Sequence, residues 1–70
     1  MIKLLILDSQ TQETIPAAKV ETNKNTYYSN FDGYVTIPKD ESIIKISYIS
    51  YKDIKNLTVK SDTTIVLESL

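Results

Sequence analysis

Residues 28–37 read Tyr28-Ser29-Asn30-Phe31-Asp32-Gly33-Tyr34-Val35-Thr36-Ile37 and contain the only glycine of a 70-residue chain. Glycine adopts a positive φ more readily than any other residue, and Asp-Gly between two short strand-like runs favours a β-hairpin turn. We therefore expect a strand on each side of the turn. Gly33 should take the left-handed conformation, while the side chains of Asn30 and Asp32 bond the turn backbone.

The rest of the composition favours β structure. Ten isoleucines, four valines and eight threonines stand against two alanines, and β-branched residues are enriched in strands. Seventy residues are enough for one domain, residues 1–70, which buries only about 60% of its unfolded surface. The chain has no cysteine, so disulfides and thiolate metal sites cannot supplement this small core.

Alternation of apolar and polar residues predicts seven short strands at residues 2–8, 18–22, 26–29, 34–37, 42–49, 51–55 and 63–68. The first is apolar on both faces, which suits a central position in a sheet. No window has the periodicity of an amphipathic helix. The pattern predicts an all-β fold, a small seven-stranded antiparallel Greek-key β-sandwich of the transthyretin-like or immunoglobulin-like kind.

Several stretches between residues 6 and 68 resemble the carboxypeptidase regulatory-like domain, a transthyretin-like β-sandwich. That domain occurs in metallocarboxypeptidases and before many TonB-dependent receptors of Bacteroidetes. The similar stretches are Ile6-Leu7-Asp8 with Thr11, Ile15-Pro16-Ala17-Ala18-Lys19-Val20, Ser29-Asn30-Phe31-Asp32-Gly33-Tyr34-Val35, Ser47-Tyr48-Ile49-Ser50-Tyr51-Lys52 and Ile65-Val66-Leu67-Glu68. Ala17 and Ser50 stand where the family has glycine, and Asn30 where it has aspartate. The resemblance implies a non-catalytic structural or contact role.

Three function classes lack the residues that they need. Eight lysines, no arginine and nine acids give a net charge of -1 without a basic cluster, so we expect no nucleic-acid partner. Without histidine or cysteine, nucleophilic triads and imidazole metal sites are excluded. We expect no catalytic residue and no cofactor, since the candidate carboxylates should lie in loops or on solvent faces: Asp8, Glu13, Glu21, Asp40 and Glu41.

The Asp-Gly turn also overlaps part of a calcium-binding loop. Asn30, Asp32 and Gly33 fit that pattern, but Tyr28 and Lys39 stand where it needs acidic ligands. We therefore expect no metal site and assign these three residues a structural role in the turn.

The aromatic residues are the candidates for an interface. Alternation predicts Tyr28 in the core, with Tyr27 and Tyr34 on the outer face of one hairpin and Phe31 at its tip. Phe31 either caps the open end of the sandwich or contacts a partner, because aromatic residues are enriched at interfaces. The sheet edges are a second candidate: lysines near the sixth strand would block an edge, or an edge would accept a neighbour's strand. These lysines are Lys52, Lys55 and Lys60.

These observations predict a non-catalytic structural or protein-interaction module. Its partners would be other protein subunits, in a homo-oligomer or a larger assembly such as a bacteriophage virion, where it would be an accessory or decoration protein. The alternatives are an accessory domain of an envelope receptor or carboxypeptidase, or a carbohydrate-binding module using Tyr27 and Tyr34. The apolar run 4–7 is too short for a signal peptide or a membrane span. This favours the cytoplasm or a virion, or the periplasm for a fragment of an envelope protein.

Overall fold

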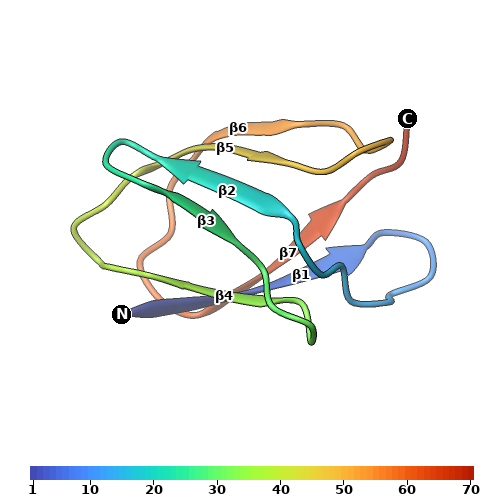
Figure 1. Ribbon diagram of the computed structural model, residues 1–70, viewed down its shortest axis with the longest axis horizontal. Helices are drawn as coiled ribbons and strands as arrows, with labels where there is room; N and C mark the ends of the chain where they lie inside the picture. The colour runs from blue at the N-terminus through green and yellow to red at the C-terminus, as the bar shows by residue number, and fades with distance from the viewer.

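A computed structural model describes all 70 residues and confirms the all-β fold with seven strands. The strands are β1 (Ile2–Asp8), β2 (Lys19–Thr22), β3 (Thr26–Tyr28), β4 (Tyr34–Ile37), β5 (Ile43–Ser47), β6 (Ile54–Leu57) and β7 (Thr63–Leu67). They form a three-stranded sheet, β4-β1-β7, and a four-stranded sheet, β3-β2-β5-β6. Figure 1 shows the two sheets as separate layers. The chain forms no helix long and apolar enough to cross a membrane.

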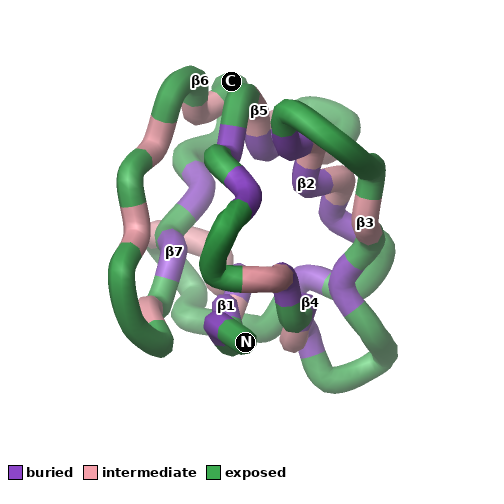
Figure 2. The backbone as a smooth tube through the Cα atoms, turned by 90° about the vertical axis from the view of Figure 1, so that its left-hand side faces the viewer, coloured by how far each residue is buried: buried purple, intermediate pink, exposed green.

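The core lies between the two sheets. Every strand except the edge strands β3 and β6 contributes buried apolar side chains, and two more come from the segment before β2 (Figure 2). Alternation along β1 turns Ile2, Leu4 and Ile6 inward, as the period of two in a strand requires. The twelve core residues are Ile2, Leu4, Ile6, Ile15, Ala18, Val20, Val35, Ile37, Ile43, Ile46, Ile65 and Leu67.

The central place expected for the first strand is confirmed, because β1 lies between β4 and β7. The expected antiparallel pairing is wrong for one pair: β1 and β7 run parallel, with Ile6 opposite Ile65. Parallel neighbours need a long crossover connection. Since these strands are the first and last of the chain, the other five strands form that crossover.

The Asp-Gly turn does not join a hairpin. β3 pairs with β2 and β4 pairs with β1, so the turn carries the chain from one sheet to the other. Gly33 has a φ of 85°, and the Asn30 side chain accepts bonds from the N–H groups of Asp32 and Tyr34. Both features agree with the expected turn, whereas the Asp32 side chain makes no hydrogen bond. Local turn signals are the same for a hairpin and for a corner between sheets, which explains the error.

The expected orientations of Tyr27 and Tyr28 are reversed. Tyr27 lies opposite the buried Val20 and packs against the core, whereas Tyr28 is 60% exposed. Ser29 is buried on the same side as Tyr27, because its hydroxyl donates to the C=O of Ile15 and accepts from the N–H of Ala18. These two bonds offset the cost of burying a hydroxyl, so the polar Ser29 takes an inward position. Because residues two apart in a strand share a face, Tyr27 then faces inward and Tyr28 faces outward.

Two strands differ from the expected bounds by more than one residue. The fifth ends at Ser47, and the sixth begins at Ile54 because the chain turns at Ile49 and Ser50. A register shift opposite Glu21 and Thr22 leaves Ile44 46% exposed while Ile43 and Ile46 are buried. Such an irregularity rotates the strand by one residue, so the simple alternation of inward and outward side chains along β5 is interrupted at Ile44.

Two non-glycine residues hold the left-handed conformation at the positions where the resembled family has glycine. The φ of Ala17 is 62° and that of Ser50 is 69°. A left-handed residue with a Cβ costs about 1–2 kcal/mol. The left-handed conformation at Ala17 and Ser50 therefore lowers the stability of the folded state by about this amount at each position.

Substitutions at the left-handed positions should change stability in opposite directions. A Cβ on Gly33 would lie 2.8 Å from the Cβ of Thr14 and 3.2 Å from the C=O oxygen of Ile6. We expect Gly33→Ala to lower the free energy of unfolding by about 2 kcal/mol or more. We expect Ala17→Gly to raise it by about 0.5–1 kcal/mol, because relief of strain exceeds the added entropy of the unfolded chain. Urea unfolding measures both, and equal effects at the two positions would contradict this account.

Candidate functional site

One end of the sandwich gathers most of its long connections. β1, β3, β5 and β7 all finish there, and β2, β4 and β6 start there. Four segments therefore lie at this end, which we call the loop end: residues 9–18, 29–33, 48–53 and 68–70. It is the right-hand side of Figure 1.

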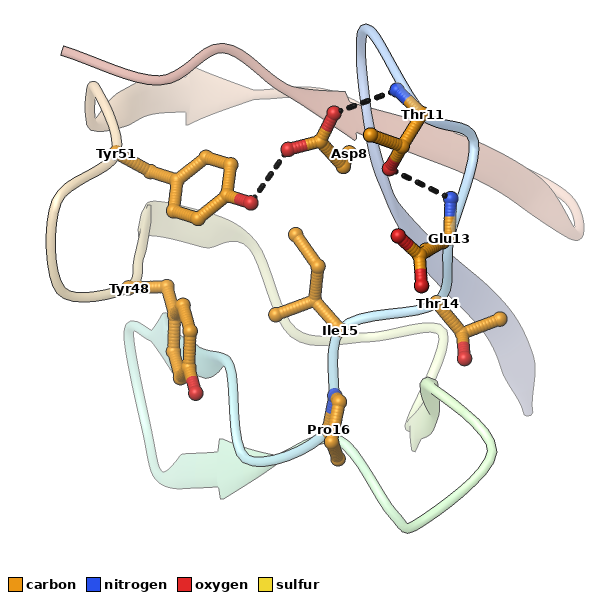
Figure 3. Close-up of a pocket in the computed structure, with 8 residues that line it drawn as sticks. All are labelled: Asp8, Thr11, Glu13, Thr14, Ile15, Pro16, Tyr48 and Tyr51. Carbon is orange, nitrogen blue, oxygen red and sulfur yellow. Dashed lines mark hydrogen bonds between the residues drawn. The ribbon is translucent and has the colours of Figure 1, made fainter.

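The loop end contains a pocket of about 380 Å³. Its lining combines acidic, aromatic and aliphatic side chains from two of the loop-end segments and from the last residue of β1 (Figure 3). The rings of Tyr48 and Tyr51 form one wall, with centroids 5.9 Å apart and planes tilted by 47°. The lining residues are Asp8, Thr11, Glu13, Thr14, Ile15, Pro16, Tyr48 and Tyr51.

Asp8 is the anchor of this pocket. Its Oδ1 accepts from the backbone N–H groups of Gln10 and Thr11, at 2.7 and 2.8 Å. The Tyr51 hydroxyl donates to its Oδ2 at 2.5 Å. The Tyr51 bond, followed by the two backbone bonds, lowers the pKa of Asp8 from 3.8 to about 2. The carboxyl is therefore a fixed anion at neutral pH, which suits electrostatic contact better than proton transfer.

Tyr51 is held in place by the same bond. The hydrogen bond to Asp8 raises the pKa of the Tyr51 phenol above its ordinary value of 10.0, so the hydroxyl remains a donor. The backbone of Tyr51 forms an antiparallel bridge with Ser69. These contacts fasten the connection after β5 to the end of β1 and to the C-terminal segment.

Large apolar side chains project from the same end without cover. Phe31 is 91% exposed and Ile49 is 81% exposed. Phe31 therefore does not cap the open end of the sandwich, which removes one of its two expected roles. Large apolar side chains that are left exposed are candidates for interaction sites.

The other expected interface residues lie elsewhere. Tyr27 belongs to the four-stranded sheet and faces inward. Tyr34 is on the outer face of the three-stranded sheet, where Nζ of Lys3 lies 4.3 Å from the centre of its ring. Tyr27, Phe31 and Tyr34 therefore form no common surface, and Tyr27 and Tyr34 form no flat platform for a sugar.

Glu41, expected in a loop or on a solvent face, is instead one of the buried polar residues, only 9% exposed. It lies in the connection before β5, at the end opposite the loop end. Its carboxylate accepts from the Thr22 hydroxyl at 2.6 Å and from the Tyr27 hydroxyl at 2.9 Å. The Thr22 bond is the largest cause of its lowered pKa. In sequence, the run Pro38-Lys39-Asp40-Glu41 has the composition of a solvated turn. The hydrogen-bond donors that stabilise the buried Glu41 carboxylate come from the distant strands β2 and β3, so no local signal indicates its burial.

The Asp8–Tyr51 pair was also missed, because 43 residues separate its members. One local signal was available: Asp8 ends an apolar strand and precedes polar residues. Asp side chains at such positions often bond the following backbone N–H groups. Nothing local indicates the tyrosine.

Removing the Tyr51 hydroxyl should raise the pKa of Asp8. We expect Tyr51→Phe to move it from about 2 toward the ordinary 3.8, without reaching it, since the two backbone donors remain. Because the folded pKa lies below the unfolded one, the Asp8 contribution to stability is complete above about pH 3.8 and is lost as pH falls through 2. Tyr48→Phe is the control, since its hydroxyl does not contact Asp8. NMR titration of the Asp8 carboxyl measures the change, and an unaltered Asp8 pKa in Tyr51→Phe would contradict the assignment.

Glu41 gives a second pH-dependent contribution of the same sign. Its folded pKa lies below 4.5, so its stabilisation is present above that pH and is lost on acidification. We expect Glu41→Gln to be less stable at pH 7 and to lose less stability between pH 5 and 3. Glu13→Gln, at an exposed carboxylate without a hydrogen bond, should match the unsubstituted protein. Urea unfolding across this pH range is the measurement, and parallel curves for Glu41→Gln and the unsubstituted protein would refute the role.

Comparison with known proteins adds no relative: no family model matches the chain, and no curated protein matches it. The carboxypeptidase regulatory-like resemblance therefore stays a prediction from the quoted motifs. The two-sheet, seven-stranded architecture is established by the structure alone.

Proposed function

We propose that this protein is a non-catalytic interaction module that docks onto another protein through its loop end. The observation that carries the proposal is the exposure of Phe31 and Ile49 at the end that also contains the tyrosine-walled pocket. Burying a large aromatic side chain removes 150–250 Å² from water. At about 25 cal/mol per Å², contact with Phe31 alone would supply several kcal/mol before the costs of association.

The electrostatics of the loop end support a partner with complementary charge. Asp8 is a fixed anion and Glu13 lies beside it in the pocket lining, which includes no lysine. Aromatic walls with carboxylates attract cationic groups. A partner surface with an apolar centre and a nearby lysine or arginine would match both features.

The biological setting that we propose is a larger protein assembly, such as a bacteriophage virion in which this chain is an accessory or decoration component. The motif resemblance and the two-sheet, seven-stranded architecture support a contact role of this kind. An accessory domain of an envelope receptor or carboxypeptidase would use the same surface. The identity of the protein captured by the loop end distinguishes these settings.

A photo-crosslinking residue in place of Phe31 tests the docking surface. We expect it to form a covalent adduct with one partner protein in the source organism's assemblies, while the same residue in place of Ile44 does not. Ile44 is a matched control, because it is a partly exposed apolar residue outside the loop end. Equal labelling from the two positions would refute docking at the loop end.

Binding to the purified partner then measures the contribution of Phe31. We expect Phe31→Ala to weaken binding by about 2 kcal/mol, roughly thirtyfold, as for an interface hot spot. The free energy of unfolding of the same variant should differ from that of the unsubstituted protein by less than about 0.5 kcal/mol, because the Phe31 side chain is 91% exposed. Isothermal titration and urea unfolding measure the two effects. A loss of stability with unchanged binding would mean that Phe31 supports the fold instead.

A further inference from the structure

The four edge strands of the sandwich differ in how their outer backbone groups are covered. β3 has three residues, and β6 is distorted by Asn56, with a φ of 54°. At the start of β4, Asn30 occupies both outer groups of Tyr34: its N–H donates to the Tyr34 C=O and its Oδ1 accepts from the Tyr34 N–H. Short length, irregularity and side-chain cover are common ways of protecting an edge.

β7 has none of these protections along its five residues. It contains no charge, proline or irregularity, and reads Thr63-Thr64-Ile65-Val66-Leu67. The bond from the Ser9 N–H to the Leu67 C=O shows that Leu67 directs its groups toward β1. Backbone groups alternate in direction along a strand. The N–H and C=O groups of Thr64 and Val66 therefore point away from the sheet, and no other group bonds them.

The chain itself begins to cover this edge beyond β7. The Lys52 N–H donates to the Glu68 C=O, the Leu70 N–H donates to the Ser50 C=O, and Tyr51 forms an antiparallel bridge with Ser69. Residues 50–52 thus act as a short antiparallel neighbour. After Lys52 the chain leaves for β6, so this cover stops before Val66.

A groove lies beside the uncovered part of the edge. Its volume is about 280 Å³ and its lining is Lys52, Asp53, Ile54, Val66 and Glu68. Ile54 is partly buried against the core, while Val66 is 41% exposed. The charged members are already paired: Lys52 with Glu68 at 3.5 Å, and Asp53 with Lys45 at 3.7 Å. The groove therefore offers apolar surface between neutralised charges.

We propose that β7 accepts an extended segment of a different protein, antiparallel to it, as a fourth strand of the β4-β1-β7 sheet. The segment spans about five residues opposite Thr63–Leu67. Its inward side chains are β-branched or apolar and lie against Ile54, and a basic residue follows opposite Asp62. Strand addition of this kind gains affinity from backbone bonds and specificity from pockets for alternate side chains. The inference rests on the proposed interaction role but concerns a surface separate from the loop end.

A second copy of this chain fits the edge poorly in the register that joins Thr64 of one copy to Val66 of the other. In a two-fold antiparallel pair that joins Thr64 to Val66, Asp62 of one copy must lie opposite Glu68 of the other. That place is already taken by Lys52, which bonds the Glu68 backbone. Carboxylates directly opposite each other are also destabilising. A free segment avoids both conflicts, because its chain can leave the edge at Leu67.

The test uses the whole protein and an acetylated, amidated peptide of sequence Val-Thr-Val-Thr-Val-Lys. We expect the peptide to shift the NMR signals of the Thr64 and Val66 amides and to slow their hydrogen exchange, while the Thr36 amide on the opposite edge strand β4 is unaffected. Thr64→Pro removes an outward N–H, which an edge strand tolerates, and should weaken binding by about tenfold. The signals of Phe31 and Ile49 report separately on the loop end.

Peptide variants keep the test decisive if Thr64→Pro does not fold. Proline at the second or fourth position, whose N–H faces β7, should abolish binding, whereas proline at the third position, whose N–H faces away, should weaken it less. Replacing the final lysine by glutamate should also weaken binding, by repulsion from Asp62. Absence of binding, equal binding by all proline variants, or self-association of the protein through β7 would each overturn the proposal. None of these results bears on capture of a partner by Phe31.

Discussion

The close approach of the Gly33 backbone to β1 is the constraint on which the sandwich depends. The Gly33 C=O accepts from the Ile6 N–H, and the space around its Cα is filled by Thr14 and by the backbone of Ile6 and Ile15. The contact places β4 beside β1 immediately after the chain has left β3 in the other sheet. A residue with a Cβ would push this corner away from the centre of the three-stranded sheet. The single glycine is therefore a packing requirement as much as a turn signal.

Polar contacts close the two ends of the core. At the loop end, Asp8 joins the end of β1 to Tyr51; at the opposite end, Glu41 joins the connection before β5 to Thr22 and Tyr27. A 70-residue domain has little apolar area to spare, and charge-assisted hydrogen bonds are stronger than neutral ones. No buried side-chain nitrogen or oxygen lacks a partner. The same carboxylates make the fold sensitive to acid, because each has a lowered pKa.

The topology separates the two surfaces that we propose for partners. The loop end collects side chains from connections, so its contacts depend on exposed groups such as Phe31 and on the fixed charge of Asp8. The β7 edge offers backbone groups, so its contacts depend on strand geometry and on one groove. Parallel pairing with β1 makes β7 an edge of the three-stranded sheet, with its last residue at the loop end. An assembly protein with two such surfaces can join two different neighbours.

The sequence by itself determined the all-β class, seven strands, the central place of β1, the left-handed Gly33 and the role of Asn30. These features follow from composition, short-range alternation and local turn chemistry, which act within a few residues. Only the tertiary structure decided that the Asp-Gly turn is a corner between sheets, that β1 and β7 are parallel, and that Tyr27 faces the core. It alone joined Asp8 to Tyr51 and buried Glu41. Each of these depends on a partner distant in the sequence, and the hydrogen bonds that such partners supply override the local pattern.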